Sequence, residues 1–286
     1  MSDLTLRAAT PEDRDAVMAI SATVWEGHDY LPHVWDEWVS ESADKGFLLV
    51  GESDEQVVAV QHTSFQPRSV AWMEGIRVHP DYRNRGFGTQ MLEHAIRQAS
   101  EQGFITARLS TASLNDASAK VATSHGFREV ARFQIFRGEP ATEPGHTIRL
   151  SDIGPEDVAE LRRRLDIDTT LIVNQWTAYD LPGQKATSDF PHQLMHETDQ
   201  MVDGIGLGSD SRDRNELSIA YLEGTTDAVE QLGRGFRELA VRMGRDAVSG
   251  MLPDRDDISR GLRRAGFELD GRMSVLVFEL GLEPNR

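Results

Sequence analysis

The sequence predicts an α/β (α+β) fold with two tandem domains, each a mixed sheet flanked by helices. Three observations support this prediction. Strand-like and helix-like apolar patterns alternate along the chain, a segment of domain length is repeated, and a glycine-bearing turn joins an apolar strand to a helix near residues 78–89. The length of 286 residues is sufficient for two domains of ordinary size.

The repeat is visible at both ends of each copy. Residues 5–13 (TLRAATPED) resemble residues 147–157, and Gly126-Phe127 with the apolar strand after it resembles Gly266-Phe267. Because the offset is nearly constant, we expect two copies of a whole domain. The predicted domains are residues 1–138 and 146–286, and residues 139–145, rich in Pro and Gly, form the linker.

The elements of the first domain follow from periodicity and from capping signals. Thr10 is a candidate N-cap, Pro11 suits the first helical position, and Asp13 stands three residues after the cap. The expected order is strand 4–8, helix 11–25, helix 32–43, strand 46–51, strand 56–65, strand 70–78, helix 88–102, strand 106–111, helix 116–125 and strand 128–137.

The turn after the strand 70–78 reads Arg83-x-x-Gly86-x-Gly88. Free N–H groups and the positive end of the helix dipole attract an anion at such a turn. The glycines allow positive φ and let a phosphate approach the backbone. The spacing excludes a Walker A loop and a Rossmann loop. We expect a diphosphate site; the alternative is an ordinary strand-to-helix turn.

The turn, together with Asn115-x-Ala117-Ser118 and Gly126-Phe127, resembles the GNAT (GCN5-related) N-acetyltransferase superfamily. The resemblance implies mostly antiparallel sheets, acetyl-CoA as co-substrate and no metal. It implies backbone contacts to pantetheine along the strand, pyrophosphate contacts in the turn, and a further contact from Asn115. The implied cofactor-binding residues are Ile76, Arg77, Val78, Arg83, Arg85, Gly86, Phe87, Gly88, Thr89 and Asn115.

Glu74 and Tyr30 are the candidate catalytic residues. Glu74 is a carboxylate in an otherwise apolar strand, which is costly unless the group is paired or functional, and burial would raise its pKa toward that of a general base. An ion pair with Arg or a solvated edge position is the alternative. Gly75 beside it suggests a β-bulge.

Tyr30 lies in a segment, residues 25–38, that contains three Trp residues and the polar set His28, Asp29 and Tyr30. Trp35 and Trp38 have helical spacing and are expected in the core. This segment, with Glu74 to Val78, resembles the tandem branch that includes histidine N-acetyltransferase, as does the second-domain segment 172–179. The resemblance implies an amine or amino-acid acceptor, with Arg77 or another Arg pairing with its carboxylate.

One position departs from the superfamily pattern. The superfamily often has a Tyr four residues before the Gly of Gly-Phe as general acid, and here that residue is Ala122. His125 is a nearby substitute, although a surface His at a helix end is the simpler interpretation.

The second copy lacks the glycine turn. Residues 222–229 (LEGTTDAV) carry Glu223 and Asp227 where a diphosphate would need donors, and Gln231 to Met243 is expected to continue the helix. We therefore expect one working cofactor site. His192 and His196 have the i, i+4 spacing of a metal pair on a helix, but without a third ligand the non-metal interpretation is favoured.

Composition excludes several classes of protein. There is no cysteine, hence no disulfide framework and no thiolate nucleophile, and no apolar run reaches bilayer length, so we expect a cytoplasmic protein without membrane contact. The net charge of −17 argues against nucleic-acid binding. Only three basic residues are Lys, which fits either a high-salt cytoplasm or an ordinary acidic enzyme from a GC-rich genome.

The predicted function is acetyl-CoA-dependent acetyl transfer to the amine of a small molecule or amino acid. An acyl-CoA-binding regulatory module without turnover and a protein lysine or N-terminal acetyltransferase are the alternatives. The predicted assembly is a monomer, in which the second domain mimics a dimer partner, or a homodimer.

Overall fold

The computed structural model describes residues 3–27, 29–41, 43–142, 148–150, 153–168, 170–181 and 190–283. His28 and residues 143–145 of the predicted linker lie outside this part. The chain forms two compact units: the first contains residues 1–110, 116–130 and 278–286, and the second contains residues 111–115 and 131–277. Unlike the predicted domains, these units are not single stretches of sequence, and the predicted boundaries stay predictions.

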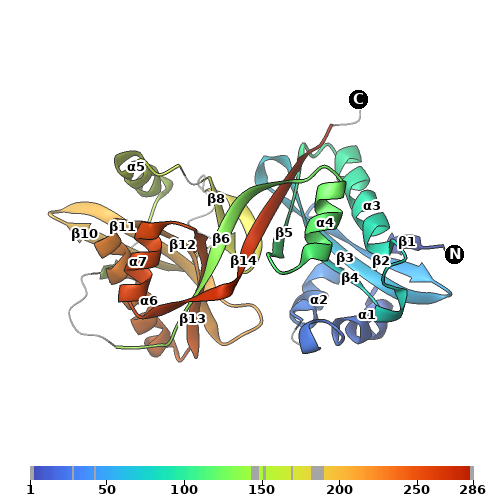
Figure 1. The fold of residues 1–286 in the computed structure, drawn as a ribbon, viewed down its shortest axis with the longest axis horizontal. Helices are drawn as coiled ribbons and strands as arrows, with labels where there is room; N and C mark the ends of the chain where they lie inside the picture. Colours follow the sequence, from blue (N-terminus) through green and yellow to red (C-terminus); the bar gives the residue numbers. More distant parts are fainter. Residues whose placement is uncertain are drawn as a thin grey trace. The chain divides into compact units, whose positions relative to one another are not determined.

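The first unit has the strand and helix order expected from the sequence (Figure 1). Its strands are β1 (Thr5–Ala8), β2 (Gly46–Ser53), β3 (Gln56–Gln66), β4 (Val70–Val78) and β5 (Thr106–Ala112), followed by β6 (Arg128–Gly138), which continues into the second unit. Its helices are α1 (Arg14–Ser21), α2 (Leu31–Ser40), α3 (Phe87–Glu101) and α4 (Asp116–Ser124), with short 3-10 turns at Pro11–Asp13, Trp25–Gly27, Pro67–Ser69 and Pro80–Tyr82.

Strands β1 to β4 of the first unit pair antiparallel in sequence order, and β4 pairs parallel with β5. Successive side chains of each strand point to opposite faces of the sheet, and helices cover both faces. Leu48, Val50 and Val60 pack with α1 and α2, whereas Leu49 and Ala59 pack with Met91 of α3. The predicted core positions Trp35 and Trp38 are confirmed, with 1% and 4% of their surface exposed.

The end of the chain supplies further residues to the first unit. Strand β14 (Phe267–Gly281) passes from the second unit to the first at Phe278. There Glu279 accepts a 2.7 Å hydrogen bond from Arg108, Leu282 N–H donates to the carbonyl of Ile105 at 2.8 Å, and Ser100 binds the carbonyl of Glu283 at 2.6 Å. The first unit is therefore built from segments at both ends of the sequence.

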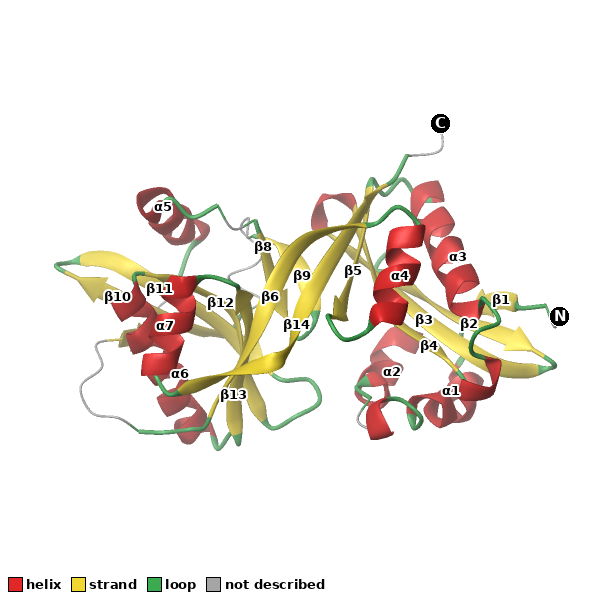
Figure 2. Ribbon diagram, in the orientation of Figure 1, coloured by secondary structure: helices red, strands yellow, loops and turns green. Residues whose placement is uncertain are grey.

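The second unit repeats the order of the first, with one replacement (Figure 2). A hairpin, β8 and β9, stands where the first unit has α2, and it contains the segment 172–179 that was noted for its resemblance to the tandem branch. The elements are β7 (Ile148–Leu150), α5 (Pro155–Leu165), β8 (Leu171–Asn174), β9 (Thr177–Asp180), β10 (His192–Thr198), β11 (Met201–Asp210), β12 (Glu216–Gly224), α6 (Thr226–Met243), β13 (Ala247–Pro253), α7 (Asp256–Arg264) and β14.

Strand pairing in the second unit also follows the first. Strands β7, β10, β11 and β12 pair antiparallel, and β12 pairs parallel with β13. The capping acid is shared as well: Asp13 accepts from the N–H of Thr10 at 2.7 Å, and Asp157 accepts from the N–H of Gly154 at 2.8 Å. The repeat in the sequence thus corresponds to a repeat of two mixed, mostly antiparallel sheets with flanking helices.

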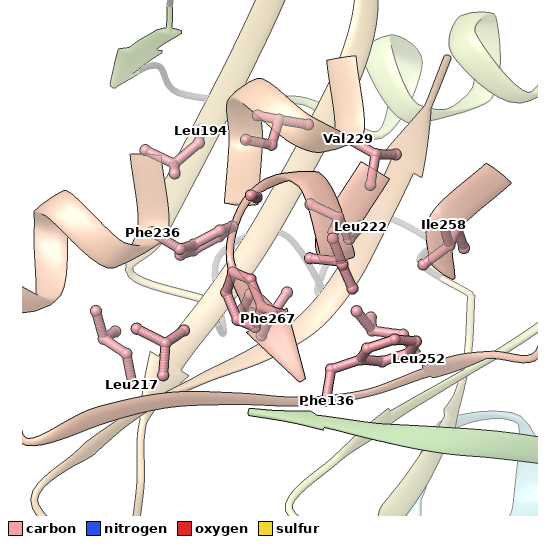
Figure 3. Packing of buried hydrophobic residues seen from close by; sticks show 14 of the residues in the cluster. Phe136, Leu194, Leu217, Leu222, Val229, Phe236, Leu252, Ile258 and Phe267 are labelled. Carbon is pink, nitrogen blue, oxygen red and sulfur yellow. The ribbon is translucent and has the colours of Figure 1, made fainter. Parts of the chain in front are cut away.

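The core of the second unit is apolar and lies between α6, α7 and the sheet (Figure 3). Phe236 of α6 packs with Leu217 and Leu222 of β12. The glycines of Gly233-Arg234-Gly235 lie inside α6, as predicted. A Cβ on Gly233 would lie 2.8 Å from the Cβ of Ala265, so this glycine lets α6 pack closely against α7.

Two sequence predictions need correction. The helix predicted at 11–25 is a 3-10 turn followed by α1, which ends at Ser21. His192 and His196 lie on the strand β10 and not on a helix, and His196 is bound to Asp203 at 2.6 Å. Within the described residues, no helix combines the length and the apolar character needed to cross a bilayer.

Candidate active site

A β-bulge in β4 determines which side chains share a face of the first unit. Val60 pairs with Arg77 and His62 pairs with Glu74, so β4 has one residue more than β3 between these pairs. Gly75 lies in this interval with φ of +68°, which confirms the predicted bulge. Without the extra residue, Glu74 and Arg77 would point to opposite faces, because they are three positions apart. The bulge turns both toward α2 and the loop before it.

The pairing of β4 with β5 is short. It covers Val70, Ala71 and Trp72 and does not continue to Glu74 in the described residues. The next residues of β4 therefore keep backbone groups that β5 does not bind. These residues include Ile76, Arg77 and Val78, which were predicted to contact the cofactor through the backbone.

Glu74 belongs to a cluster of three residues built around the buried ring of His62. The His62 ring lies between two carboxylates, with Nδ1 3.2 Å from Oε1 of Glu74 and Nε2 2.8 Å from Oε2 of Glu41. The His62 side chain is 2% exposed, and those of Glu74 and Glu41 are 15% and 17% exposed. The Trp38 ring stacks on the imidazole at 4.2 Å between centroids.

The surroundings of His62 favour its charged form. Burial lowers the pKa of the imidazole, but hydrogen bonds with Glu41 and Glu74 and the charges of both carboxylates outweigh burial, so the net pKa is raised. The two carboxylates of the cluster thus favour the protonated form of the ring between them.

Tyr30 and Arg77 form a second cluster beside the first. Arg77 binds Asp29 through two hydrogen bonds of 2.9 and 3.1 Å, and Ser21 donates to the same carboxylate at 3.0 Å. The Arg77 guanidinium lies 4.8 Å from the ring of Trp25 and 5.5 Å from that of Tyr30. Because Asp29 already occupies the fork of Arg77, an acceptor carboxylate would have to displace Asp29 to bind there.

Tyr30 connects the two clusters. Its ring packs edge-on against Trp38, with centroids 6.0 Å apart. Burial raises the pKa of the Tyr30 phenol well above its ordinary value, and the negative charge of Glu74 adds to this effect. Tyr30 therefore keeps its proton at neutral pH and can serve as a hydrogen-bond donor, not as a base. The two predicted catalytic residues are thus brought to one region of the first unit.

The predicted diphosphate turn begins α3. Gly86 is the N-cap residue with φ of +80°, and a Cβ there would meet no atom within 4 Å. The first N–H groups of a helix have no partner inside the helix, which leaves those of Phe87, Gly88 and Thr89 available to an anion. A Cβ on Gly88 would lie 3.9 Å from side-chain carbons of Ile76 and Val78, so the turn packs directly on β4.

Two arginines give this turn a positive charge. Both are exposed, and each is tied to the backbone before the helix: Arg83 donates to the carbonyl of Val78 at 3.2 Å, and Arg85 donates to that of Asp81 at 2.9 Å. The Arg85 guanidinium also lies 4.6 Å from the ring of Tyr82. The charge, the open glycine and the free N–H groups fit a diphosphate.

Three predicted positions lie elsewhere. Asn115 belongs to the second compact unit, so its contact with pantetheine stays a prediction. Ala122 is buried in α4. His125 is half-buried directly after α4, with Nδ1 2.7 Å from the carbonyl of Val121 and Nε2 3.2 Å from Glu93, so both ring nitrogens have protein partners.

The equivalent turn of the second unit is closed to an anion. The hydroxyl of Thr225 caps α6 by accepting from the N–H of Ala228 at 3.2 Å. Asp227 in the first turn of α6 lies 3.1 Å from Arg264, and the buried Glu223 is bound by Arg255 at 2.6 Å. At this end of α6, the Thr225 side chain therefore occupies a backbone N–H group, and the carboxylates of Asp227 and Glu223 would repel an anion. Across the described part of the chain, no cluster of His, Asp and Glu residues suits a metal ion.

Sequence reasoning missed Glu41, His62 and the Asp29–Arg77 pair. His62 could have been found by the same sequence signal as Glu74, because each is an ionisable residue in a largely apolar strand. Glu41 lies 21 residues from His62 in the sequence, and Asp29 lies 48 residues from Arg77, so only the folded chain shows these contacts.

Comparison with known proteins agrees with this architecture. Residues 14–127 match the sequence model of the Acetyltransferase (GNAT) family. A GCN5-related N-acetyltransferase from Sphaerobacter thermophilus has a similar structure, with a TM-score of 0.69 and 16% identity over 99% of this chain and 97% of that chain. One from Kribbella flavida has a TM-score of 0.53 and 16% identity over 99% and 72% of the two chains.

A curated relative is more similar in sequence over a shorter stretch. The histidine N-acetyltransferase of Scomber australasicus is 29% identical over 90 residues, which make up 31% of this chain and 26% of that protein. The matched part is therefore about a quarter of the length of this relative.

Proposed function

Because residues 14–127 match the GNAT acetyltransferase family, we propose that this chain transfers the acetyl group of acetyl-CoA to the amine of a small molecule or amino acid. The main support is the arrangement of β4. Its carboxylate, Glu74, lies where pairing with β5 has ended, and the anion-binding turn of α3 follows the same strand.

Acetyl-CoA supplies an acetyl group activated as a thioester. The residues present fit this molecule: Gly86 is open to solvent, three N–H groups at the start of α3 are free, and Arg83 and Arg85 are positively charged. We assign the diphosphate to Gly86, Phe87, Gly88 and Thr89, and the pantetheine arm to the edge of β4 at Ile76 to Val78, where β5 no longer pairs with it.

We assign the role of general base to Glu74. An amine is protonated at neutral pH and must lose a proton before its nitrogen can attack the acetyl carbon directly. Glu74 can accept this proton while its other oxygen stays bound to His62. Tyr30, which keeps its own proton, is assigned to orient the acceptor or the acetyl carbonyl by donating a hydrogen bond.

The acceptor is assigned to the region around Asp29, Tyr30 and the exposed Trp25. Histidine is the narrower candidate, supported by the 29% identity to histidine N-acetyltransferase. An acetyl-CoA-binding module without turnover is the second candidate, because the superfamily's usual acid position holds the buried methyl group of Ala122.

A pair of glycine variants tests the cofactor site. We expect Gly86→Glu to abolish stabilisation by acetyl-CoA in a thermal shift assay, because the new carboxylate repels the diphosphate and covers the turn. Gly103→Glu is the matched control: it has φ of +85°, is equally open and follows the other end of the same helix. It should bind acetyl-CoA like the wild type.

Normal binding by Gly86→Glu would disprove the assigned turn. The class of function is then tested by thiol release over a panel of amines and amino acids that includes histidine. Release with one or a few acceptors supports the enzyme, whereas binding without any release supports the binding module. An absence of stabilisation in the wild type would contradict both.

A further inference from the structure

We propose that Glu41 and His62 are positioning residues for Glu74: Glu41 keeps the His62 ring doubly protonated, and the charged ring holds the Glu74 carboxylate in a fixed orientation by donating a hydrogen bond to it. The inference deepens the proposed function and rests on the role assigned there to Glu74.

The first argument is the number of donors that the geometry requires. Both ring nitrogens of His62 face carboxylate oxygens, at 3.2 Å for Glu74 and 2.8 Å for Glu41. A neutral imidazole has one N–H, so it would direct a lone pair at one of the two carboxylates, whereas an imidazolium donates to both. Because the side chain is only 2% exposed, water cannot replace a missing donor. The arrangement therefore suits the charged ring.

The second argument is that neighbouring residues make room for this arrangement. A Cβ on Gly46 would lie 2.5 Å from Oε2 of Glu41, the atom that faces His62. A Cβ on Gly75 would lie 2.9 Å from the Trp38 ring, which stacks on the other side of the cluster against His62. The absence of side chains at these two positions lets Glu41 and Trp38 enclose the imidazole.

The third argument is that, among the described residues, the charges that act on the pKa of His62 are those of Glu41 and Glu74, while Arg77 in the neighbouring cluster is bound to Asp29. Strand β4 presents Glu74 to His62, and the residue after α2 presents Glu41. Strand β2 places Leu48 opposite His62 on the other side. Helix α1 packs on β3 through Val17 and Ile20, while its Arg14 and Asp15 are exposed. The pKa of His62 is raised because the two carboxylates outweigh burial.

The sign of the pH effect follows from these contacts. When the pH rises through the raised pKa of His62, the ring loses one proton. The remaining proton stays on Nε2, which makes the shorter contact, to Glu41. Nδ1 then directs a lone pair toward Glu74. Glu74 then loses its donor and its neighbouring positive charge. We therefore expect acetyl transfer to decline on the alkaline side as His62 becomes neutral.

Nuclear magnetic resonance of the His62 ring tests the inference without any acceptor. In the wild type, both ring nitrogens should be protonated at pH 7, with titration above the ordinary value of about 6.5. In Glu41→Gln, the pKa of His62 should fall, because one of two close negative charges is gone. His62→Gln identifies the signal, and Glu37→Gln, an exposed carboxylate on α2, is the control that should leave it unchanged.

A neutral His62 ring at pH 7 in the wild type would disprove the proposal even if the variant failed to fold. An unchanged His62 titration in Glu41→Gln would disprove it as well. Because this measurement needs no turnover, its outcome is separate from that of the proposed function.

The kinetic readout distinguishes this role from a structural one. Glu41→Gln should lower kcat at pH 7 and leave the KM for acetyl-CoA unchanged. The ratio of wild-type to variant kcat should approach one at lower pH, where the variant's His62 is protonated again. A ratio that does not change with pH would show that Glu41 has only a structural role.

Discussion

The half-buried Glu74 and the buried Glu223 face different kinds of cation. Glu223 on β12 is bound by Arg255 at 2.6 Å, whereas Glu74 on β4 faces His62 at 3.2 Å. Arg stays charged at physiological pH, while His can lose its proton there. The pair in the second unit is therefore a permanent ion pair, and the surroundings of Glu74 can respond to a proton transfer.

Replacing Glu74 by Gln tests its role as base. The amide keeps the shape of the side chain but cannot accept the proton of an ammonium group. We expect kcat in the thiol-release assay to fall by about 10²–10⁴-fold. The affinity for acetyl-CoA should stay unchanged, because the diphosphate turn is intact. Glu55→Gln removes an exposed carboxylate of the same unit and should keep the wild-type rate. An unchanged rate in Glu74→Gln would exclude the residue as base.

Single residues were predictable where their local sequence was unusual. Glu74 was identified because it interrupts an apolar strand, and Gly86 because it follows a strand and precedes a helix. Arg77 illustrates the limit: its sequence position suggested a partner for an acceptor carboxylate, but the folded chain supplies Asp29 as that partner. Contacts between residues far apart in sequence depend on strand register, and local patterns do not contain this information.

At the scale of elements, strong periodicity located the strands and helices well. Strand β4 has the predicted bounds, 70–78, and α3 begins at Phe87, one residue before the prediction. The helix predicted at 11–25 was too long, because its pattern continued into residues 22–27, where Trp25 has a positive φ of 46° and the chain turns. Here the conformation of the loop, not the hydrophobic pattern, ends the helix.

The bulge of β4 should be sensitive to a single methyl group. Gly75→Ala places a side chain at φ of +68° and 2.9 Å from the Trp38 ring. Gly103→Ala has a similar φ, +85°, without a neighbour within 4 Å. Gly103→Ala, the control, should lower the free energy of unfolding by about 1–2 kcal/mol through backbone strain alone. Gly75→Ala should lose a further ~1–3 kcal/mol from overpacking.

Urea unfolding of the two variants measures the difference. Equal losses of stability would show that Trp38 moves aside freely. A larger loss in Gly75→Ala would show that the bulge and the ring fit each other closely, as the cluster around His62 requires.

At the scale of the whole chain, the net charge of −17 opposes compact folding through mutual repulsion. Salt shortens the screening length from about 10 Å at 0.1 M to about 3 Å at 1 M. We therefore expect the Tm at pH 7 to rise when KCl is increased over this range. Near the sequence pI of about 4.9, where the net charge is close to zero, the same increase should have little effect.

Equal increases in Tm at both pH values would contradict this explanation. They would instead indicate the general strengthening of apolar burial by salt. The experiment tests the effect of net charge. It does not explain the preference for Arg over Lys, because the two side chains carry the same charge.

The contribution of residues 278–283 to the first unit has a consequence for synthesis. A ribosome makes the chain from the N-terminus, and domains made first can ordinarily fold first. Here the bonds made by Glu279, Leu282 and Glu283 to the rest of the first unit cannot form until the whole of the second unit has been translated. The first unit, which carries the predicted diphosphate turn, therefore cannot complete these contacts before the second unit has been translated, so a chain terminated within the second unit would lack part of the first.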